Sequence, residues 1–210
     1  MGEAFVWNVK IVEARMFERD YRDLAFVPRW GIFPTKHVQS VAEHMYYVAL
    51  YADQICTFLT TRAGHVMHDN ERLSVVRYAL IHDRHECFMS DIPGPVKREI
   101  QDPHRRENFE RNKEIQCFGN RTSPSFWPKS IVKIADLMDE YAYLYMELRM
   151  GNTLSDTDGL LKTVQDRLVK AIDVLPIEEA YKVLLFKDFI AKQADRKFLP
   201  ENDTDMAPKA

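Results

Sequence analysis

The chain has few cysteines, few glycines and no excess of positive charge, and each shortage excludes a class of protein. Its three cysteines, Cys56, Cys87 and Cys117, are widely spaced and include no C-x-x-C pair. They therefore predict reduced thiols instead of a disulfide framework or a zinc knuckle. The seven glycines form no glycine-rich phosphate loop. A net charge of −3 over 210 residues argues against a general binder of nucleic acid or anionic membranes.

Long hydrophobic runs are absent as well. No stretch approaches the length of a membrane span, and charged residues interrupt the first 20 positions, so we expect neither a transmembrane helix nor a signal peptide. The shares of hydrophobic residues, 46%, and charged residues, 29%, are those of an ordinary soluble protein. We therefore expect a cytoplasmic protein with one domain over residues 1–198 and a flexible C-terminal tail at 199–210.

Apolar residues recur at helical spacing along most of the chain. Ser40-Val41-Ala42-Glu43 has the pattern of a capping box, and an apolar stripe follows it to about residue 60. The pattern predicts helices near residues 3–19, 41–60, 72–85, 103–117, 131–150, 157–174 and 177–194. No convincing strand lies between them, so we expect an all-α bundle of about seven helices.

Residues able to carry chemistry are densest between Leu80 and Lys97, in the stretch LIHDRHECFMSDIPGPVK. His82 and Asp83 form an adjacent imidazole–carboxylate pair, which suits first-row divalent ions. On a helix, Glu86 lies on the same face as Asp83, where a general acid/base beside a metal would be needed. The alternative is a solvated helix end in which the His-Asp pair has no function.

Two more candidates for a metal site lie within or beside the apolar stripes of other predicted helices. Taken alone, His44 could be a hydrogen-bonded core residue without a metal, and Asp136 could form a salt bridge to Lys133, three residues earlier. With His82 and Asp83 they give the order H…HD…D on three predicted helices. Helical bundles build metal sites from side chains on facing helices, so the set is harder to dismiss than its members.

This order resembles the signature of the HD-domain metal-dependent phosphohydrolases. The resemblance implies an HD-domain helical bundle in which His44, His82, Asp83 and Asp136 bind one divalent ion, while Glu86 handles the proton of the attacking water. Imidazole and carboxylate ligands accept Co²⁺, Mn²⁺, Zn²⁺, Ni²⁺ or Fe²⁺, so the metal stays open. A second ion, Mg²⁺, could bridge the phosphates, but the sequence offers no dedicated ligands for it.

Further residues are similar to a narrower group, the bacterial 5′-deoxynucleotidases. Arg29-Trp30 lies about 15 residues before His44, and Asp91 lies eight residues after Asp83, with a proline following. A still closer resemblance is to phage enzymes that hydrolyse dATP in viruses whose genomes replace adenine with 2-aminoadenine. The shared features are Arg29-Trp30-Gly31-Ile32, the HDxxE run, Lys97 eleven residues after Glu86, and Lys133 three residues before Asp136.

These resemblances imply a role for each residue around the metal set. Arg29, Lys97 and Lys133 bind phosphate, with Arg suited to bidentate contact and Lys acting as a point charge. Trp30 stacks on the base, Ile32 excludes a 2-amino group, and Asp91 contacts the deoxyribose. The simpler alternatives are solvated cations, two apolar residues packing a loop, and a carboxylate that caps a turn.

The function implied is metal-dependent hydrolysis of dATP, and also of dADP and dAMP, to deoxyadenosine. In a phage that makes 2-aminoadenine DNA, this would deplete dATP in the host cytoplasm in favour of the modified nucleotide. The implied partners are a small deoxynucleotide and further copies of the chain, without a nucleic-acid polymer or a membrane. A broad 5′-deoxynucleotidase acting on dNMPs, a non-catalytic metal and nucleotide binder and a cyclic-nucleotide phosphodiesterase remain as alternatives. The three cations and Ile32 favour dATP, and Glu86 favours an enzyme over a binder.

Overall fold

The computed structural model describes residues 21–31, 33–90, 104, 108–109, 111–112, 115, 124–153 and 156–195. The regular elements of this part are all helical: the 3-10 helix η1 (Tyr21–Phe26) and the α-helices α1 (Val41–Thr61), α2 (Asp69–Ala79), α3 (Glu86–Met89), α6 (Phe126–Arg149), α7 (Thr157–Asp173) and α8 (Glu179–Ala194). Pairing of strand type is limited, within these residues, to one isolated bridge between Pro28 and Ser40. The all-α prediction is confirmed, with six α-helices in the described part.

Most predicted helices appear close to their expected bounds. The helix expected over 72–85 differs most, because α2 begins at Asp69 and already ends at Ala79. The scattered described residues between 104 and 115 are helical and exposed, as expected for that stretch. The helix predicted over 3–19 and the tail at 199–210 lie outside the described residues.

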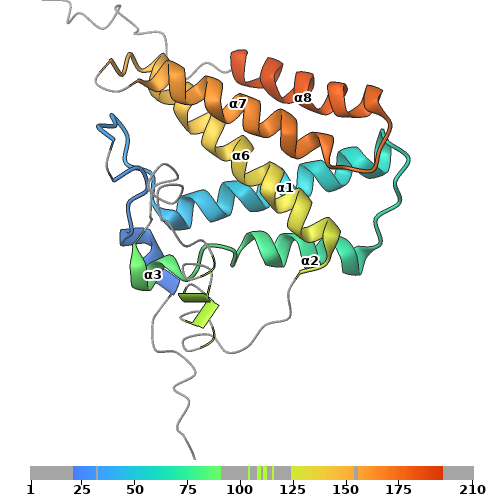
Figure 1. Cartoon of the computed structure of the whole chain (residues 1–210), viewed down its shortest axis with the longest axis horizontal. Helices are drawn as coiled ribbons and strands as arrows, with labels where there is room; N and C mark the ends of the chain where they lie inside the picture. The colour runs from blue at the N-terminus through green and yellow to red at the C-terminus, as the bar shows by residue number, and fades with distance from the viewer. Residues whose placement is uncertain are drawn as a thin grey trace, which may run out of the picture.

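Helix α6 is central to the bundle. It contacts α1, α2, α7 and α8, and in Figure 1 it runs diagonally from beside α7 toward α2. Ile131, Ile134, Ala135 and Leu137 are all at most 1% exposed, so α6 buries more than one side. A polar residue on its inner faces is therefore held among neighbouring helices.

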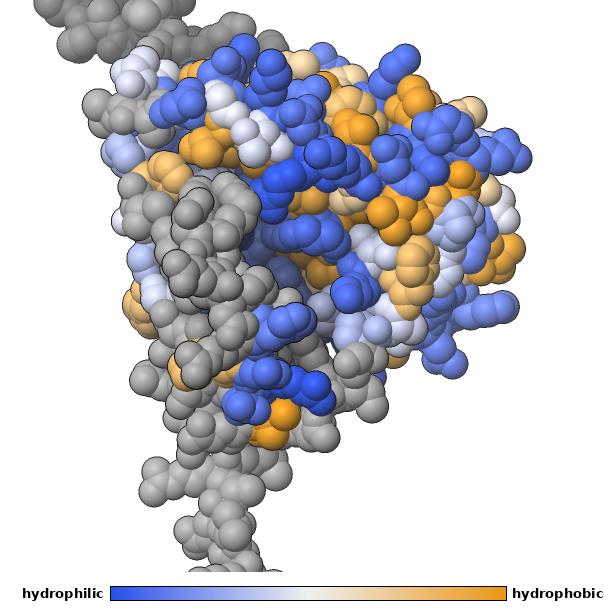
Figure 2. All heavy atoms as spheres, viewed as in Figure 1, coloured by the Kyte–Doolittle hydropathy of each residue, from blue (hydrophilic) through white to orange (hydrophobic). Residues whose placement is uncertain are grey.

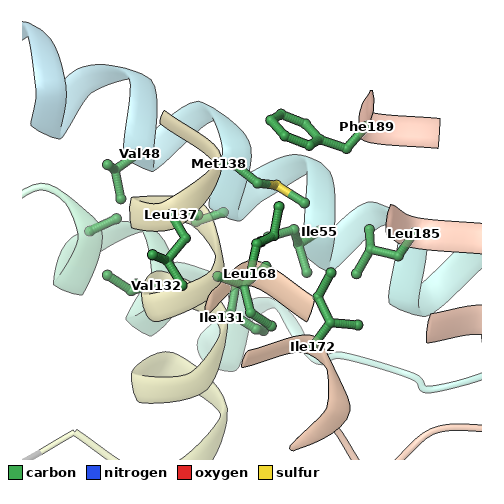
Figure 3. Packing of buried hydrophobic residues seen from close by; sticks show 14 of the residues in the cluster. Val48, Ile55, Ile131, Val132, Leu137, Met138, Leu168, Ile172, Leu185 and Phe189 are labelled. Atoms are coloured by element: carbon green, nitrogen blue, oxygen red, sulfur yellow. The ribbon is translucent and has the colours of Figure 1, made fainter. Parts of the chain in front are cut away.

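Apolar side chains fill the space between the main helices and point toward one another in Figure 3. The labelled residues are Val48 and Ile55 of α1, Ile131, Val132, Leu137 and Met138 of α6, Leu168 and Ile172 of α7, and Leu185 and Phe189 of α8. Burial of such side chains is the main force that stabilises a helical bundle of this size.

A buried carboxylate fastens the loop before α1 to the far end of α6. Glu147, 1% exposed, accepts hydrogen bonds from the backbone N–H groups of Lys36 and His37, both at 2.8 Å. Asn152 donates to the same carboxylate at 2.6 Å and to the carbonyl of Pro34 at 2.9 Å. The loop that carries Arg29 and Trp30 is thereby held against the helix that carries Asp136.

The surface mixes polar and apolar side chains. On the face shown in Figure 2, hydrophilic residues are interleaved with separate apolar ones. Within the described residues, no helix has both the length and the apolar character needed to cross a membrane.

Candidate metal centre

Helix α1 contributes His44, one turn after its N-terminus. The capping box predicted from the sequence is confirmed: the Ser40 hydroxyl accepts from the Glu43 N–H, and the Glu43 carboxylate accepts from the Ser40 N–H at 2.8 Å. This reciprocal pairing fixes where the helix begins. It therefore also fixes His44, whose side chain is fully buried against the rest of the bundle.

His82 and Asp83 lie in a turn between α2 and α3, and not on a helix as the sequence predicted. The last carbonyl groups of a helix lack partners within it, and the His82 ring supplies one: its Nδ1 lies 2.7 Å from the Ala79 carbonyl oxygen. With Nδ1–H donating to this carbonyl, the second ring nitrogen, Nε2, is left with its lone pair. The turn thus presents an imidazole that is ready to bind a metal.

Helix α6 contributes Asp136. The sequence left two interpretations of this residue, a metal ligand or a salt bridge to Lys133, and the structure has features of both. Its Oδ2 forms a salt bridge with Lys133 Nζ at 2.8 Å, the simpler interpretation of this residue. Its Oδ1 also lies 3.5 Å from His44 Nε2. The carboxylate therefore joins the candidate metal ligands while one oxygen is held by the lysine.

The three segments converge on a small polar centre. Ligand atoms of His44, His82 and Asp83 all lie within 4.8 Å of one another. Asp83 Oδ2 is 3.6 Å from His44 Nε2 and 3.4 Å from His82 Nε2, and the two imidazole rings are 5.3 Å apart. These separations suit a shared cation better than direct hydrogen bonds.

The two Nε2 atoms supply a test of whether a metal fits. Both are buried, and neither has a hydrogen-bond partner within the part of the chain that the structure describes. In each ring the opposite nitrogen is engaged, His44 Nδ1 with Asp139 Oδ2 at 2.7 Å and His82 Nδ1 with Ala79. Most buried nitrogen atoms in proteins have a hydrogen-bond partner. A metal-bound histidine binds the ion through one ring nitrogen and donates a hydrogen bond from the other, as the contacts of these two rings allow. The donor set therefore fits a divalent ion.

The electrostatics of the imidazoles agree with a site for positive charge. Burial and the nearby Arg29 disfavour the charged form of His44, but Asp139 and Asp83 outweigh them and raise its pKa to about 9. Burial lowers the pKa of His82 by more than Asp83 offsets. Without a metal, the proton on His44 supplies positive charge next to the carboxylates. A bound cation would supply that positive charge in its place.

The carboxylates are held in their charged form. Burial opposes ionisation of Asp83, but His82, His44 and Arg29 keep its pKa well below the usual value. For Asp136, Lys133 is the strongest of the positive neighbours that overcome burial and lower the pKa. Both residues therefore offer ionised oxygen atoms at neutral pH.

Glu86 stands beside this centre at the start of α3 and is 2% exposed. Its carboxylate, the Asp83 carboxylate and a ring nitrogen of His85 lie within 4.8 Å of one another. On a continuous helix, His85 would point away from Asp83. The turn after α2 instead buries it next to Asp83 and Glu86.

The loop before α1 brings Arg29 and Trp30 to the site. Arg29 helps to lower the pKa of both Asp83 and Asp136, so its charge acts on the centre. Trp30 has a φ of 63°, which is uncommon for a residue with a side chain. Its ring stacks on Tyr143 with centroids 5.3 Å apart, so one of its faces packs against α6. Ile32, Asp91 and Lys97 lie outside the described residues.

Two buried residues beside His44, Asp139 and Gln39, were not predicted from the sequence. Asp139, 3% exposed, binds His44 and also accepts from Gln39 Nε2 at 2.9 Å. The available signal was the spacing of Asp136 and Asp139, which puts two carboxylates on the buried side of one helix. Nothing in the residues around Gln39 distinguishes it from an ordinary loop glutamine.

The fold resembles that of known proteins. The family described as 5′-deoxynucleotidase YfbR-like matches residues 17–114. Among solved structures, the cyanophage S-2L HD phosphohydrolase (DatZ), bound to dA and one catalytic Zn²⁺, aligns with a TM-score of 0.67 at 18% identity, over 84% of this chain and 95% of that chain. The fold of this chain is therefore that of the HD-domain phosphohydrolases.

Proteins with similar sequences include two kinds of deoxynucleotide hydrolase. A dATP triphosphohydrolase of Salmonella phage PMBT28 is 37% identical over 83 residues, and the match spans 39% of this chain and only 43% of that enzyme. A 5′-deoxynucleotidase of Shewanella oneidensis is 24% identical over 151 residues, 64% of this chain and 75% of that enzyme. Over residues 17–114 the chain is thus similar to the YfbR-like 5′-deoxynucleotidases.

Proposed function

We propose that this protein is a metal-dependent phosphohydrolase of deoxynucleotides, with dATP as its main substrate and deoxyadenosine as the end product; dADP and dAMP are also hydrolysed. The observation that carries the proposal is the pair of buried Nε2 atoms of His44 and His82, which converge on the carboxylate of Asp83. Such a set has little use in a helical core except to hold a cation.

In this proposal His44, His82, Asp83 and Asp136 hold the divalent ion. When bound, such an ion supplies Lewis-acid activation of a phosphoryl group and of water. Co²⁺, Mn²⁺, Zn²⁺, Ni²⁺ and Fe²⁺ all suit two imidazoles and two carboxylates. A second ion, Mg²⁺, accompanies the phosphates of the substrate.

Glu86 is proposed to take the proton of the attacking water and to pass it to the leaving group. Its carboxylate is buried and lies near Asp83, which places it beside the proposed metal ligands. It is not part of the group formed by His44, His82 and Asp83, and it lies within 4.8 Å of the Asp83 carboxylate.

The cationic side chains are proposed to bind the phosphates, because phosphoryl transfer depends mainly on positioning and charge stabilisation. Arg29 already acts electrostatically on the carboxylates of the site. Lys133 is 52% exposed and bonded to Asp136, so it can reach a phosphate at the edge of the centre. Lys97 completes the set by its place in the sequence.

Trp30, Ile32 and Asp91 are proposed to select the nucleoside. Trp30 would use the face turned away from Tyr143 to stack on the base, Asp91 would bind the sugar, and Ile32 would exclude a purine with a 2-amino group. In support, the relative at 37% identity is a phage dATP triphosphohydrolase. Sparing the 2-aminoadenine nucleotide while dATP is removed would favour the modified base in DNA. We also propose a homo-oligomer in the cytoplasm.

A broad 5′-deoxynucleotidase acting on dNMPs is the second candidate. Its support is the family description and the Shewanella relative, whose match covers more of this chain than the phage match does. The alternative of a non-catalytic binder is opposed by Glu86, whose buried carboxylate a pure binder would not need.

The test is phosphate release from metal-free protein resupplied with Co²⁺, Mn²⁺ or Mg²⁺, with the nucleoside identified by chromatography. The substrates are dATP, dADP, dAMP, dGTP, dCTP, dTTP and 2-amino-dATP. We expect preference for dATP and no hydrolysis of 2-amino-dATP. Equal rates on all dNMPs with none on triphosphates would support the second candidate, and no turnover with any metal would support a binder.

A matched pair of variants tests the role of Glu86. Glu86→Gln keeps the size of the side chain but removes the base, so we expect it to lose turnover by about 100-fold or more while still binding metal. Glu140→Gln changes a carboxylate on α6 that pairs with Arg167 at 3.1 Å, and its turnover should match the wild type. Near-normal turnover of Glu86→Gln would remove Glu86 from the reaction.

A further inference from the structure

Asp139 lies behind His44, on the side away from the converging ligands. It sits one turn after Asp136 on α6 and is 3% exposed. A single oxygen, Oδ2, accepts from His44 Nδ1 at 2.7 Å and from Gln39 Nε2 at 2.9 Å. The carboxylate is therefore held between an imidazole and an amide, both of them buried.

This arrangement decides which nitrogen of His44 can bind a cation. A carboxylate only accepts hydrogen bonds, so Nδ1 of His44 must carry the proton in this contact. In the neutral ring, Nε2 then keeps its lone pair, and it is the atom that faces Asp83 and Asp136. Loss of the carboxylate would free the ring to rotate or to adopt the opposite tautomer.

Gln39 in turn fixes the carboxylate. It is 4% exposed, and its backbone carbonyl accepts from the Arg29 N–H at 2.8 Å. Its amide must point Nε2 toward Asp139, because the amide oxygen would repel the carboxylate. Gln39 thus connects the loop of Arg29 to the back of the metal centre.

We propose that Asp139, oriented by Gln39, is a positioning residue that sets the affinity of the centre for its divalent ion. It acts through His44 and touches neither metal nor substrate. The proposal rests on the proposed function in that it requires a metal at His44. A carboxylate behind a metal-binding imidazole holds the ring and makes it a better donor, and its removal commonly weakens metal binding about 10- to 100-fold.

The experiment measures Co²⁺ binding by calorimetry and by the visible spectrum of the bound ion, with thermal unfolding of each metal-free variant. Asp139→Ala should bind Co²⁺ about 10- to 100-fold more weakly. Asp139→Asn still offers an oxygen to Nδ1 but no charge, so its loss should be smaller, with a changed Co²⁺ spectrum. Gln39→Met should lose less Co²⁺ affinity than Asp139→Asn. The control Glu140→Gln, on the next residue of α6, should bind Co²⁺ like the wild type.

The outcomes separate this proposal from the proposed function. A wild type that binds none of the divalent ions would remove the metal centre itself, and both proposals with it. Tight wild-type binding with unchanged Co²⁺ affinity and spectrum in Asp139→Asn and Gln39→Met would overturn the positioning role alone. If Asp139→Ala does not fold, the two conservative variants decide, since a merely structural role would lower the melting temperature of metal-free protein without changing Co²⁺ affinity.

Discussion

The buried carboxylate of Glu147 should be worth several kcal/mol to the fold, and Glu147→Gln tests this without reference to any activity. Three donors converge on its two oxygens: the Lys36 N–H and the Asn152 amide on Oε2, and the His37 N–H on Oε1. The side chain is 1% exposed, so water cannot replace a lost partner. Glutamine has the same shape but offers only one acceptor oxygen.

The magnitude follows from this geometry. If the glutamine oxygen takes the place of Oε2, its NH2 group faces the His37 N–H and leaves one buried donor unpaired, at a cost of about 1–3 kcal/mol. The two remaining hydrogen bonds lose their charged acceptor, while the neutral side chain is less costly to bury. The net destabilisation should be roughly 2–4 kcal/mol, which for a protein of this size lowers the melting temperature by roughly 4–16 °C.

Thermal and urea unfolding followed by circular dichroism would measure the effect. Glu140→Gln is the control, because it removes a charge from the same helix but from a pair with Arg167 that is partly open to solvent. We expect this control to lose at most about 1 kcal/mol. A Glu147→Gln variant as stable as the control would refute the assignment of Glu147 as the anchor of the loop.

Three other predictions concern single residues. Ile32→Ala should raise the rate on 2-amino-dATP relative to dATP by about 10-fold or more, and unchanged selectivity in a competition assay would place the selector elsewhere. Ser90 has φ 64° and ψ 165°, a conformation that strains a residue with a side chain and favours glycine. Ser90→Gly should therefore stabilise the protein by about 1 kcal/mol in urea unfolding. A destabilised variant would show that the backbone at Ser90 is not strained. Burial raises the pKa of Cys56 to about 11, so the folded state holds its thiol proton more tightly than the unfolded state. This contribution to stability is present below about pH 9 and declines as the pH rises toward 11, an effect that Cys56→Ala should remove from unfolding curves measured across that range.

The helices were predictable where local signals and burial agree. The apolar stripe of α1 and its capping box are both encoded within a few residues, so its start was predicted correctly at Val41. Helix α6 was predicted from its many apolar positions, although it begins at Phe126, five residues before the expected start. A start without a side-chain cap leaves little in the sequence to mark it.

The segment of His82 and Asp83 was predicted wrongly as helix because its residues have helical spacing. The turn contains a contact that helical spacing does not reveal, between the His82 ring and the Ala79 carbonyl. Leu80, at the start of this turn, is 46% exposed. The turn nevertheless leaves ligand atoms of both residues within 4.8 Å of a ligand atom of His44.

Asp139 shows why a candidate set of metal ligands is easier to predict than the residues proposed to support it. Ligands for one ion must include particular side chains, and two of them are adjacent in the sequence, so a pattern of four residues is recognisable. A supporting residue has only to present an acceptor to one ring nitrogen, and an Asp, a Glu, an amide or a backbone carbonyl can do this. Here Nδ1 of His44 contacts the Asp139 carboxylate, whereas Nδ1 of His82 contacts the Ala79 carbonyl. Because the requirement is met by chemistry of several kinds at no set spacing, it emerges only when the distances around each imidazole are known.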